Sequence, residues 1–99
     1  MKLPIVISRP ARREFDGAAD WYELERSGLG ERFIRAVNAR LEQIGNDPLR
    51  YAIEFQDIRC ANISGFPYYV IYYRVEDDKV VIVSIFHSSR DPAEWQSRI

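Results

Sequence analysis

Apolar residues recur at helical spacing in two stretches of the N-terminal half. In the first stretch the intervals are four, three and four residues, at Ala11, Phe15, Ala18 and Tyr22. The second stretch has a similar stripe, at Phe33, Val37, Leu41 and Ile44. Ser8 followed by Pro10 is typical of a helix start, and residues 27–30 and 45–48 are typical of helix ends. Since only a short turn separates them, the helices should pack as an antiparallel hairpin.

Four other segments are rich in β-branched and aromatic residues and predict strands, at residues 3–7, 58–63, 66–75 and 80–86. Residues 49–56 show no clear period and indicate a connecting loop. Near the C-terminus, Asp91 followed by Pro92 predicts a short capped helix that includes Trp95. The pattern therefore predicts an α+β fold in the order β-α-α-β-β-β, with an antiparallel sheet, a helical hairpin packed on one face and a short C-terminal helix.

The last two predicted strands are joined by a turn within residues 76–79. Hairpin loops of two or four residues give the same register, in which the numbers of paired residues add up to 155. Two faces result, one with Tyr68, Val70, Tyr72 and Arg74 against His87, Ile85, Val83 and Val81, the other with Tyr69, Ile71, Tyr73 and Val75 against Phe86, Ser84, Ile82 and Val80. Because neither face is polar, we expect one to pack on the helices and the other on a partner.

Length and composition bound the class of protein. The 99 residues fit one domain, 1–99, and the 46% hydrophobic and 29% charged content is typical of a globular chain. A net charge of −1 provides no overall positive field for nucleic acid, so such a role would need a local basic patch. The single cysteine and the short, proline-broken N-terminal apolar run predict a cytoplasmic protein without a membrane segment. One histidine and one cysteine predict no metal site, and no cofactor is expected.

Short motifs are spread over nearly the whole chain: Ser8-x-Pro10-Ala11-x-x-Glu14-Phe15, Trp21-Tyr22, Gly28-Leu29-Gly30-x-x-Phe33, Asp47-Pro48, Ile58-Arg59, Phe66-Pro67-Tyr68, Tyr72-Tyr73-Arg74, and His87-x-x-Arg90-Asp91-Pro92-x-x-Trp95. In this order the sequence resembles the RelE/ParE family of bacterial type II toxins. The resemblance implies a small antiparallel sheet with two N-terminal helices. It also implies a growth inhibitor that a cognate antitoxin neutralises in a hetero-oligomeric complex.

The family has two branches with different targets. RelE-like members cleave messenger RNA in the ribosome, whereas ParE-like members poison DNA gyrase without cutting RNA. Where the cleaving branch has an arginine in its first long strand, this chain has Val70, and its C-terminal arginine and tyrosine positions fall on Ser89 and Trp95. Valine and the indole N–H provide no acid, base or cation for phosphoryl transfer. The resemblance is therefore closer to the ParE-like branch and implies DNA gyrase as the target.

Two alternatives remain open at this point. One is a ribosome-dependent endoribonuclease that uses Arg59, His87 and Arg90, and the other is a decayed toxin that retains only antitoxin binding. Charge disfavours docking on ribosomal RNA, because nine basic residues face nine acidic ones through Phe55, and five face six afterwards. We expect His87, beside Tyr68, to have a structural role.

Candidate binding residues are arginines and tryptophans. Arg59, Arg74 and Arg90 either gather and hold phosphate or an acidic antitoxin segment, or pair with nearby carboxylates. Trp21 is a candidate for the partner surface, because it and its neighbour Tyr22 cannot both enter the core. The C-terminal residues Arg90, Trp95 and Arg98 either form a target contact, or Trp95 closes the open end of the core.

Overall fold

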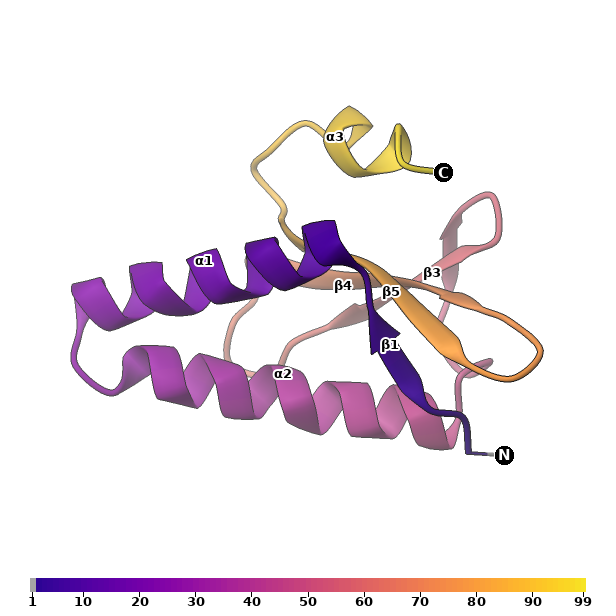
Figure 1. Ribbon diagram of the computed structural model, residues 1–99. Coiled ribbons are helices and arrows are strands. Elements are labelled where there is room, and N and C mark those ends of the chain that lie inside the picture. Colours follow the sequence, from indigo (N-terminus) through magenta and orange to yellow (C-terminus); the bar gives the residue numbers. More distant parts are fainter. Residues whose placement is uncertain (1) are drawn as a thin grey trace.

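The computed structural model describes residues 2–99, which form a helical hairpin packed on a mixed sheet (Figure 1). The elements are β1 (Ile5–Ile7), α1 (Arg9–Glu25), α2 (Leu29–Asn46), β2 (Ile53–Phe55), β3 (Ile58–Asn62), β4 (Tyr69–Val75), β5 (Val80–His87) and α3 (Ala93–Gln96). The α+β class, the antiparallel helical hairpin and the short C-terminal helix are confirmed.

The sheet within residues 2–99 has five strands in the order β1-β5-β4-β3-β2. The expected antiparallel sheet is mostly confirmed, with two differences. Strand β1 runs parallel to β5, whereas the other strand pairs are antiparallel. A parallel pair needs a long connection, and here the helical hairpin and strands β2 to β4 lie between β1 and β5 in the chain. The segment 49–56 is not only a loop, since it contains β2 at the edge of the sheet. Its three residues are too few, and its side chains too exposed, to give a period.

Local contacts explain where the helices begin and how closely they pack. The Ser8 hydroxyl accepts a hydrogen bond from Ala11 N (3.3 Å) and caps α1. Between the helices, the Glu23 carboxylate accepts hydrogen bonds from Gly28 N (2.9 Å) and Gly30 N (3.1 Å). A Cβ at Gly30 would lie 2.4 Å from the Ala19 carbonyl oxygen. The short turn therefore needs glycine at residue 30, where α2 approaches the backbone of α1.

The main core lies between the helical hairpin and one face of the sheet. Its buried side chains include Phe15, Phe33, Ile71, Tyr73 and Ile82. A second, smaller cluster lies on the opposite face of the sheet and is formed by Ile58, Val83, Phe86 and Trp95. The second face, which was expected to pack on a partner, is thus covered in part by the chain's own C-terminal helix.

The register of the last hairpin follows the predicted sum near the turn and departs from it further along. Val75 lies opposite Val80 and Tyr73 opposite Ile82, but Tyr72 then lies opposite Ser84 and Tyr69 opposite His87. Val83 is the extra residue of a β-bulge, which shifts every later pair by one position.

The bulge also changes which side chains share a face. Phe86 lies with Val83 under α3, whereas the prediction put these two residues on opposite faces. Ile85 packs in the main core and not with Tyr72. Both differences have one cause, because an extra residue in a strand reverses the alternation of all side chains that follow it.

Candidate binding groove beside helix α1

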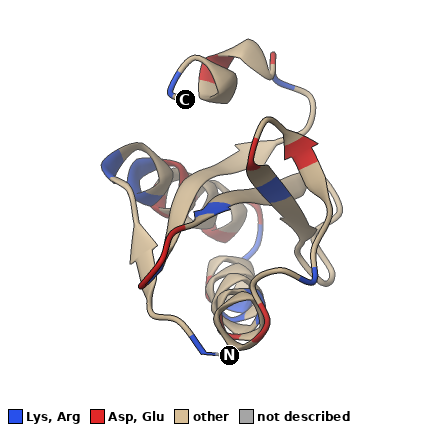
Figure 2. Ribbon diagram, turned by 90° about the vertical axis from the view of Figure 1, so that its right-hand side faces the viewer, with Lys and Arg blue, Asp and Glu red and all other residues tan. Residues whose placement is uncertain are grey.

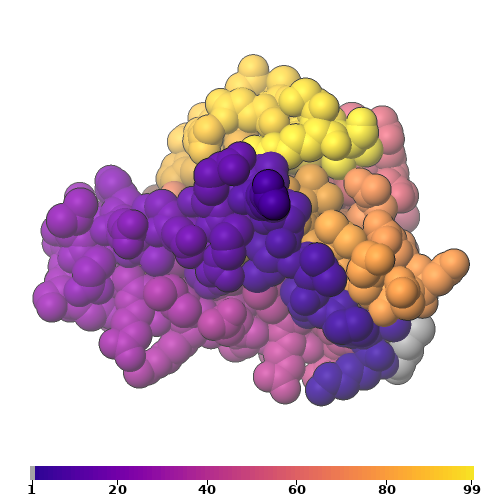
Figure 3. Space-filling view, in the orientation of Figure 1, coloured from indigo at the N-terminus to yellow at the C-terminus, as the bar shows by residue number. Residues whose placement is uncertain are grey.

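A groove runs between α1 and the segment that follows β5. Its larger part has a volume of about 470 Å³ and is lined by Pro10, Arg13, Glu14, Gly17, Ala18, Trp21, Tyr69, Ile85, Arg90 and Arg98. Its smaller part, of about 270 Å³, is lined by Trp21, Tyr69, His87, Ser89 and Arg90. Because the two hollows share Trp21, Tyr69 and Arg90, we treat them as one and call them the α1 groove. The space-filling view shows the C-terminal segment lying over the start of α1 (Figure 3).

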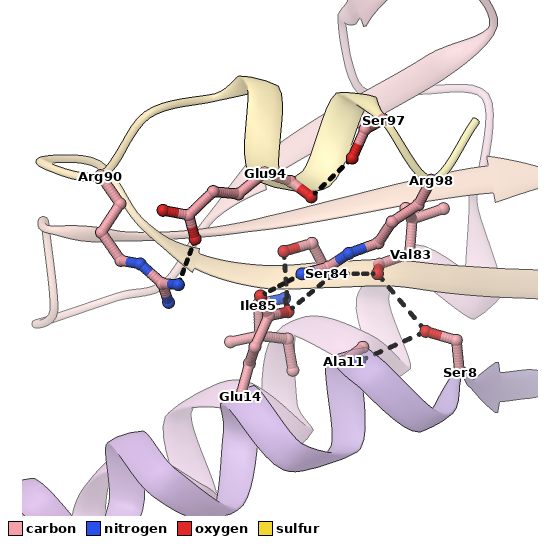
Figure 4. Close-up of polar contacts among 10 residues, drawn as sticks. All are labelled: Ser8, Ala11, Glu14, Val83, Ser84, Ile85, Arg90, Glu94, Ser97 and Arg98. Atoms are coloured by element: carbon pink, nitrogen blue, oxygen red, sulfur yellow. Dashed lines mark hydrogen bonds and ion pairs between the residues drawn. The ribbon is translucent and has the colours of Figure 1, made fainter.

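One end of the α1 groove is closed by an ion pair between Glu14 and Arg98, which are 84 residues apart in the chain (Figure 4). Arg98 Nη2 lies 2.8 Å from Glu14 Oε2, and the side chains are only 25% and 11% exposed. Glu14 Oε1 also accepts hydrogen bonds from Ser84 Oγ (2.8 Å) and Ile85 N (3.2 Å). One carboxylate therefore joins α1, β5 and the C-terminal segment.

Arg90 lies at the other side of the α1 groove. Its guanidinium pairs with Glu94, four residues later in the chain, and its carbon Cζ lies 5.1 Å from the centre of the Phe86 ring. These two contacts orient the side chain where it leaves the sheet. Arg90 and Arg98, two of the residues predicted from sequence, thus line the same groove.

Trp21 forms part of the groove wall and is 55% exposed. Its neighbour Tyr22 packs inward against Phe33 and Phe66, with ring centroids 5.0 Å apart in both cases. Burial raises the pKa of Tyr22 above its ordinary value. The prediction that only one of the two adjacent aromatic residues enters the core is confirmed, because neighbouring residues of a helix point in different directions.

His87 has its ring fixed by aromatic neighbours and by the next turn. It stacks on Tyr68 with centroids 5.8 Å apart and planes inclined by 12°, and it meets Tyr69 edge-on at 5.0 Å. Ser89 N–H donates to His87 Nδ1 at 3.1 Å, and Ser89 Oγ lies 2.7 Å from the same nitrogen. These contacts hold the ring against β4 and the turn that follows β5, as expected of a structural role.

Arg59 is bound to backbone away from the α1 groove. Its Nη1 donates to the carbonyl oxygens of Tyr51 (2.7 Å) and Leu49 (3.2 Å). It lies opposite Tyr73, four residues along β4 from the position opposite His87, a span of about 13 Å at roughly 3.3 Å per residue. The structure therefore does not bring Arg59 together with His87 and Arg90.

Arg74 also lies apart from Arg90. Its Nε is 4.0 Å from Asp57 Oδ2, and its side chain lines a separate cavity that it shares with Arg98. Of the two alternatives for Arg59, Arg74 and Arg90, the gathering is not formed, because the first two lie on neighbouring strands at a distance from the end of β5.

Trp95 is 1% exposed and stacks on Tyr72 with ring centroids 4.0 Å apart. It also meets the ring of Phe55 edge-on at 5.7 Å. Trp95 therefore closes the open end of the core, which was the alternative to a target contact. Its ring does not line the α1 groove.

Sequence reasoning missed most of the groove lining: Pro10, Arg13, Glu14, Gly17, Ala18, Tyr69, Ile85 and Ser89. A signal was present for Arg13, Glu14 and Gly17. Arg13, Gly17 and Trp21 recur every four residues and Glu14 lies next to this row, so they share one side of α1. The sequence placed Tyr69 on the correct face of the sheet, with Ile71 and Tyr73, but nothing near it in the chain indicates that it meets α1.

The described residues provide neither a metal site nor a membrane-spanning helix. Within residues 2–99, no group of three or more His, Cys, Asp or Glu side chains is placed to hold a metal ion. No helix among the described residues is long and apolar enough to cross a membrane. Lys, Arg, Asp and Glu positions are interspersed along the chain (Figure 2).

Comparisons with known proteins agree with this fold. The profile of the family described as "ParE toxin of type II toxin-antitoxin system, parDE" matches residues 5–92. The chain therefore belongs to the ParE family of toxins of type II toxin–antitoxin systems. A solved structure of the chromosomal ParDE TA system from P. aeruginosa is similar in fold, with 18% sequence identity and a TM-score of 0.64 over 86% of this chain and 95% of that one. No curated protein matches the sequence.

Proposed function

We propose that this ParE-type toxin inhibits growth by binding DNA gyrase through the α1 groove, without a chemical step of its own. The observation that carries the proposal is the half-exposed Trp21 on the wall of a groove that also holds Arg90 and Arg98. Tryptophan and arginine are the residue types that most often dominate the binding energy of protein interfaces. Gyrase as the target rests on membership of the ParE family.

A non-enzymatic mechanism is supported by the arrangement of the alternative catalytic residues. Arg59 is hydrogen-bonded to two backbone carbonyls and lies far along the sheet from His87 and Arg90. Phosphoryl transfer needs cations and an acid or base within hydrogen-bond reach of one phosphate. We therefore place the endoribonuclease reading second and use it as an outcome of the test.

The cognate antitoxin neutralises the toxin by covering the same groove. Three arginines, Arg13, Arg90 and Arg98, line it against two carboxylates, Glu14 on its wall and Glu94 paired with Arg90, so a segment with acidic side chains complements its net positive charge. Antitoxin and gyrase then compete for one surface, and the toxin–antitoxin complex is a hetero-oligomer.

The test uses purified full-length toxin with DNA gyrase, plasmid DNA and ATP. We expect DNA cleaved by gyrase to accumulate, and we expect the antitoxin to suppress this. Gly17→Leu should abolish the effect, because a Cβ at residue 17 meets nothing within 4 Å and the rest of the side chain extends into the groove. Ala39→Leu, on the exposed side of α2, is the matched control and should remain active.

Two results would contradict the proposal. Folded Gly17→Leu that traps gyrase as well as the parent does would place the contact elsewhere. Parent protein that leaves gyrase unaffected and cuts messenger RNA in translating ribosomes would establish the endoribonuclease alternative.

A further inference from the structure

A separate small cavity lies on the other side of Arg98 from the α1 groove. It has a volume of about 210 Å³ and is lined by Ser8, Pro10, Arg74, Val81, Val83 and Arg98. Sites for drug-sized ligands usually measure about 300–1,000 Å³, so this cavity suits an ion or a single functional group. Its walls come from the start of α1, from β4 and β5, and from the residues after α3.

Arg74 is incompletely satisfied at this cavity. Its Nε is buried and has no hydrogen-bond partner, and the carboxylate oxygen of Asp57 paired with it lies 4.0 Å away, beyond hydrogen-bond distance. A buried donor without a partner is costly and rare in folded proteins, which points to an acceptor that the chain itself does not provide.

Arg98 has donors to spare on the opposite wall, and Ser8 has one weakly engaged hydroxyl there. Arg98 uses three of its five N–H groups, two on Glu14 and one on the Val83 carbonyl oxygen. The Ser8 hydroxyl donates to the same carbonyl at a long 3.4 Å (Figure 4). A hydroxyl held so weakly can rotate toward a better acceptor in the cavity.

The charge around the start of α1 favours an anion. The first turn of α1 has no acidic side chain, and Arg9, Arg12 and Arg13 lie within its first five residues. Cations at this end of a helix are unfavourable because the helix dipole is positive there. Only Arg12 among these three is neutralised on its own helix, by Asp16 at 3.0 Å. A bound anion beside Ser8 would compensate the remaining charge.

We propose that this cavity binds a phosphate group, free or as a monoester, between Arg74 and Arg98. Two guanidinium groups that approach from different elements match the several oxygens of a tetrahedral dianion. The bound group would join β4, the start of α1 and the C-terminal segment. This inference goes beyond the proposed function and does not rest on it, since it concerns neither gyrase nor the antitoxin.

The test is a titration of the full chain with inorganic phosphate at constant ionic strength, followed by NMR. We expect saturable shifts of the Arg74 Nε–H, Ser8 and Val83 signals, and a rise in Tm beyond that given by chloride. Glycerol 3-phosphate, tested in parallel, distinguishes a monoester ligand from free phosphate. Binding as tight as that of inorganic phosphate, or tighter, indicates a site for a monoester, and weaker binding indicates a site for free phosphate.

Three variants should weaken, strengthen or leave unchanged the binding of phosphate. Arg74→Gln should weaken phosphate binding at least tenfold, whereas Asp57→Asn should strengthen it, because the carboxylate competes for Arg74. Arg35→Gln removes an arginine that pairs with Glu31 on α2 outside the cavity, and it should bind like the parent. Equal affinities of Arg74→Gln and Arg35→Gln, or no rise in Tm beyond that with chloride, would overturn the proposal. Asp57 is exposed, so Asp57→Asn should fold, and its phosphate affinity still tests the proposal if Arg74→Gln fails to fold.

Discussion

The indole of Trp95 lies flat on the phenol ring of Tyr72, with centroids 4.0 Å apart and planes inclined by 18°. This contact attaches the C-terminal helix to the face of the sheet that the helical hairpin leaves uncovered. Val83 and Phe86 are buried beneath the same helix, the former as the extra residue of the bulge. The C-terminal segment is thereby positioned so that Arg90 and Arg98 line the α1 groove.

Trp95→Ala should lower the free energy of unfolding by about 3–5 kcal/mol, because it removes a large buried ring and leaves a cavity. The matched control is Trp21→Ala, which replaces a ring that is 55% exposed and should change stability by only about 0.5 kcal/mol. Urea denaturation followed by circular dichroism measures both. Equal losses of stability in the two variants would show that Trp95 is not a core residue in solution.

Glu14→Gln should lower the free energy of unfolding by about 1.5–3 kcal/mol. The amide retains one acceptor oxygen but cannot accept the paired hydrogen bonds of Arg98 together with those of Ser84 and Ile85. Glu31→Gln is the control, since its pair with Arg35 is exposed and is worth about 0.5 kcal/mol. A smaller loss for Glu14→Gln than for Glu31→Gln would argue against the ion pair as an attachment of the C-terminal segment.

Gly30→Ala should destabilise the protein by about 1–3 kcal/mol, because its Cβ would lie 2.4 Å from the Ala19 carbonyl oxygen and 2.9 Å from Glu23 Cβ. Gly17→Ala, on the neighbouring helix α1, should instead raise the stability. Its Cβ meets nothing within 4 Å, so the variant should gain about 0.5–1 kcal/mol from helix propensity alone. Thermal unfolding of both variants tests the close approach of α1 and α2, which Gly30→Ala without loss of Tm would contradict.

Stability should fall at alkaline pH because of Tyr73. Burial raises the pKa of this phenol, whose hydroxyl donates to the Pro48 carbonyl oxygen at 2.7 Å. The unfolded chain releases the proton near pH 10, while the folded chain retains it, so the free energy of unfolding falls above about pH 10. The stabilisation by this group is fully present below about pH 10. Above that pH the free energy of unfolding falls by about 1.4 kcal/mol for each pH unit, as long as the folded chain retains the proton.

Tyr73→Phe isolates this contribution. The pKa values of Tyr22, Tyr69 and Tyr72 are also raised by burial, so part of the alkaline loss should remain in the variant. Urea denaturation at several pH values between about 8 and 11 gives the slope for each protein. The same slope in Tyr73→Phe and the parent would mean that Tyr73 is ionised in the folded state.

The sequence predicted the elements that bury a continuous face. The stripes from Ala11 to Tyr22 and from Phe33 to Ile44 are long enough to define two helices, and the exposure of Trp21 follows from its position next to Tyr22. The bulge at Val83 could not be predicted, because the run 80–86 is apolar except for Ser84 and has no alternation to mark the register.

The site was less predictable than the fold. Arg59 binds carbonyl groups of an irregular segment whose path the sequence does not determine. The partner of Glu14 lies 84 residues away, so nothing near it in the chain indicates the pair with Arg98.

The central claim is that toxicity depends on contact through the α1 groove and not on catalysis by His87. The most direct measurement induces the parent, His87→Gln or Gly17→Leu in cells without the antitoxin, at equal levels of folded protein. The number of surviving colonies is then counted for each. Glutamine retains a donor and an acceptor but cannot exchange a proton near neutral pH. We predict that His87→Gln stops growth like the parent and that Gly17→Leu is harmless. A harmless His87→Gln beside a toxic Gly17→Leu, with messenger RNA cut only by the toxic proteins, would contradict the account.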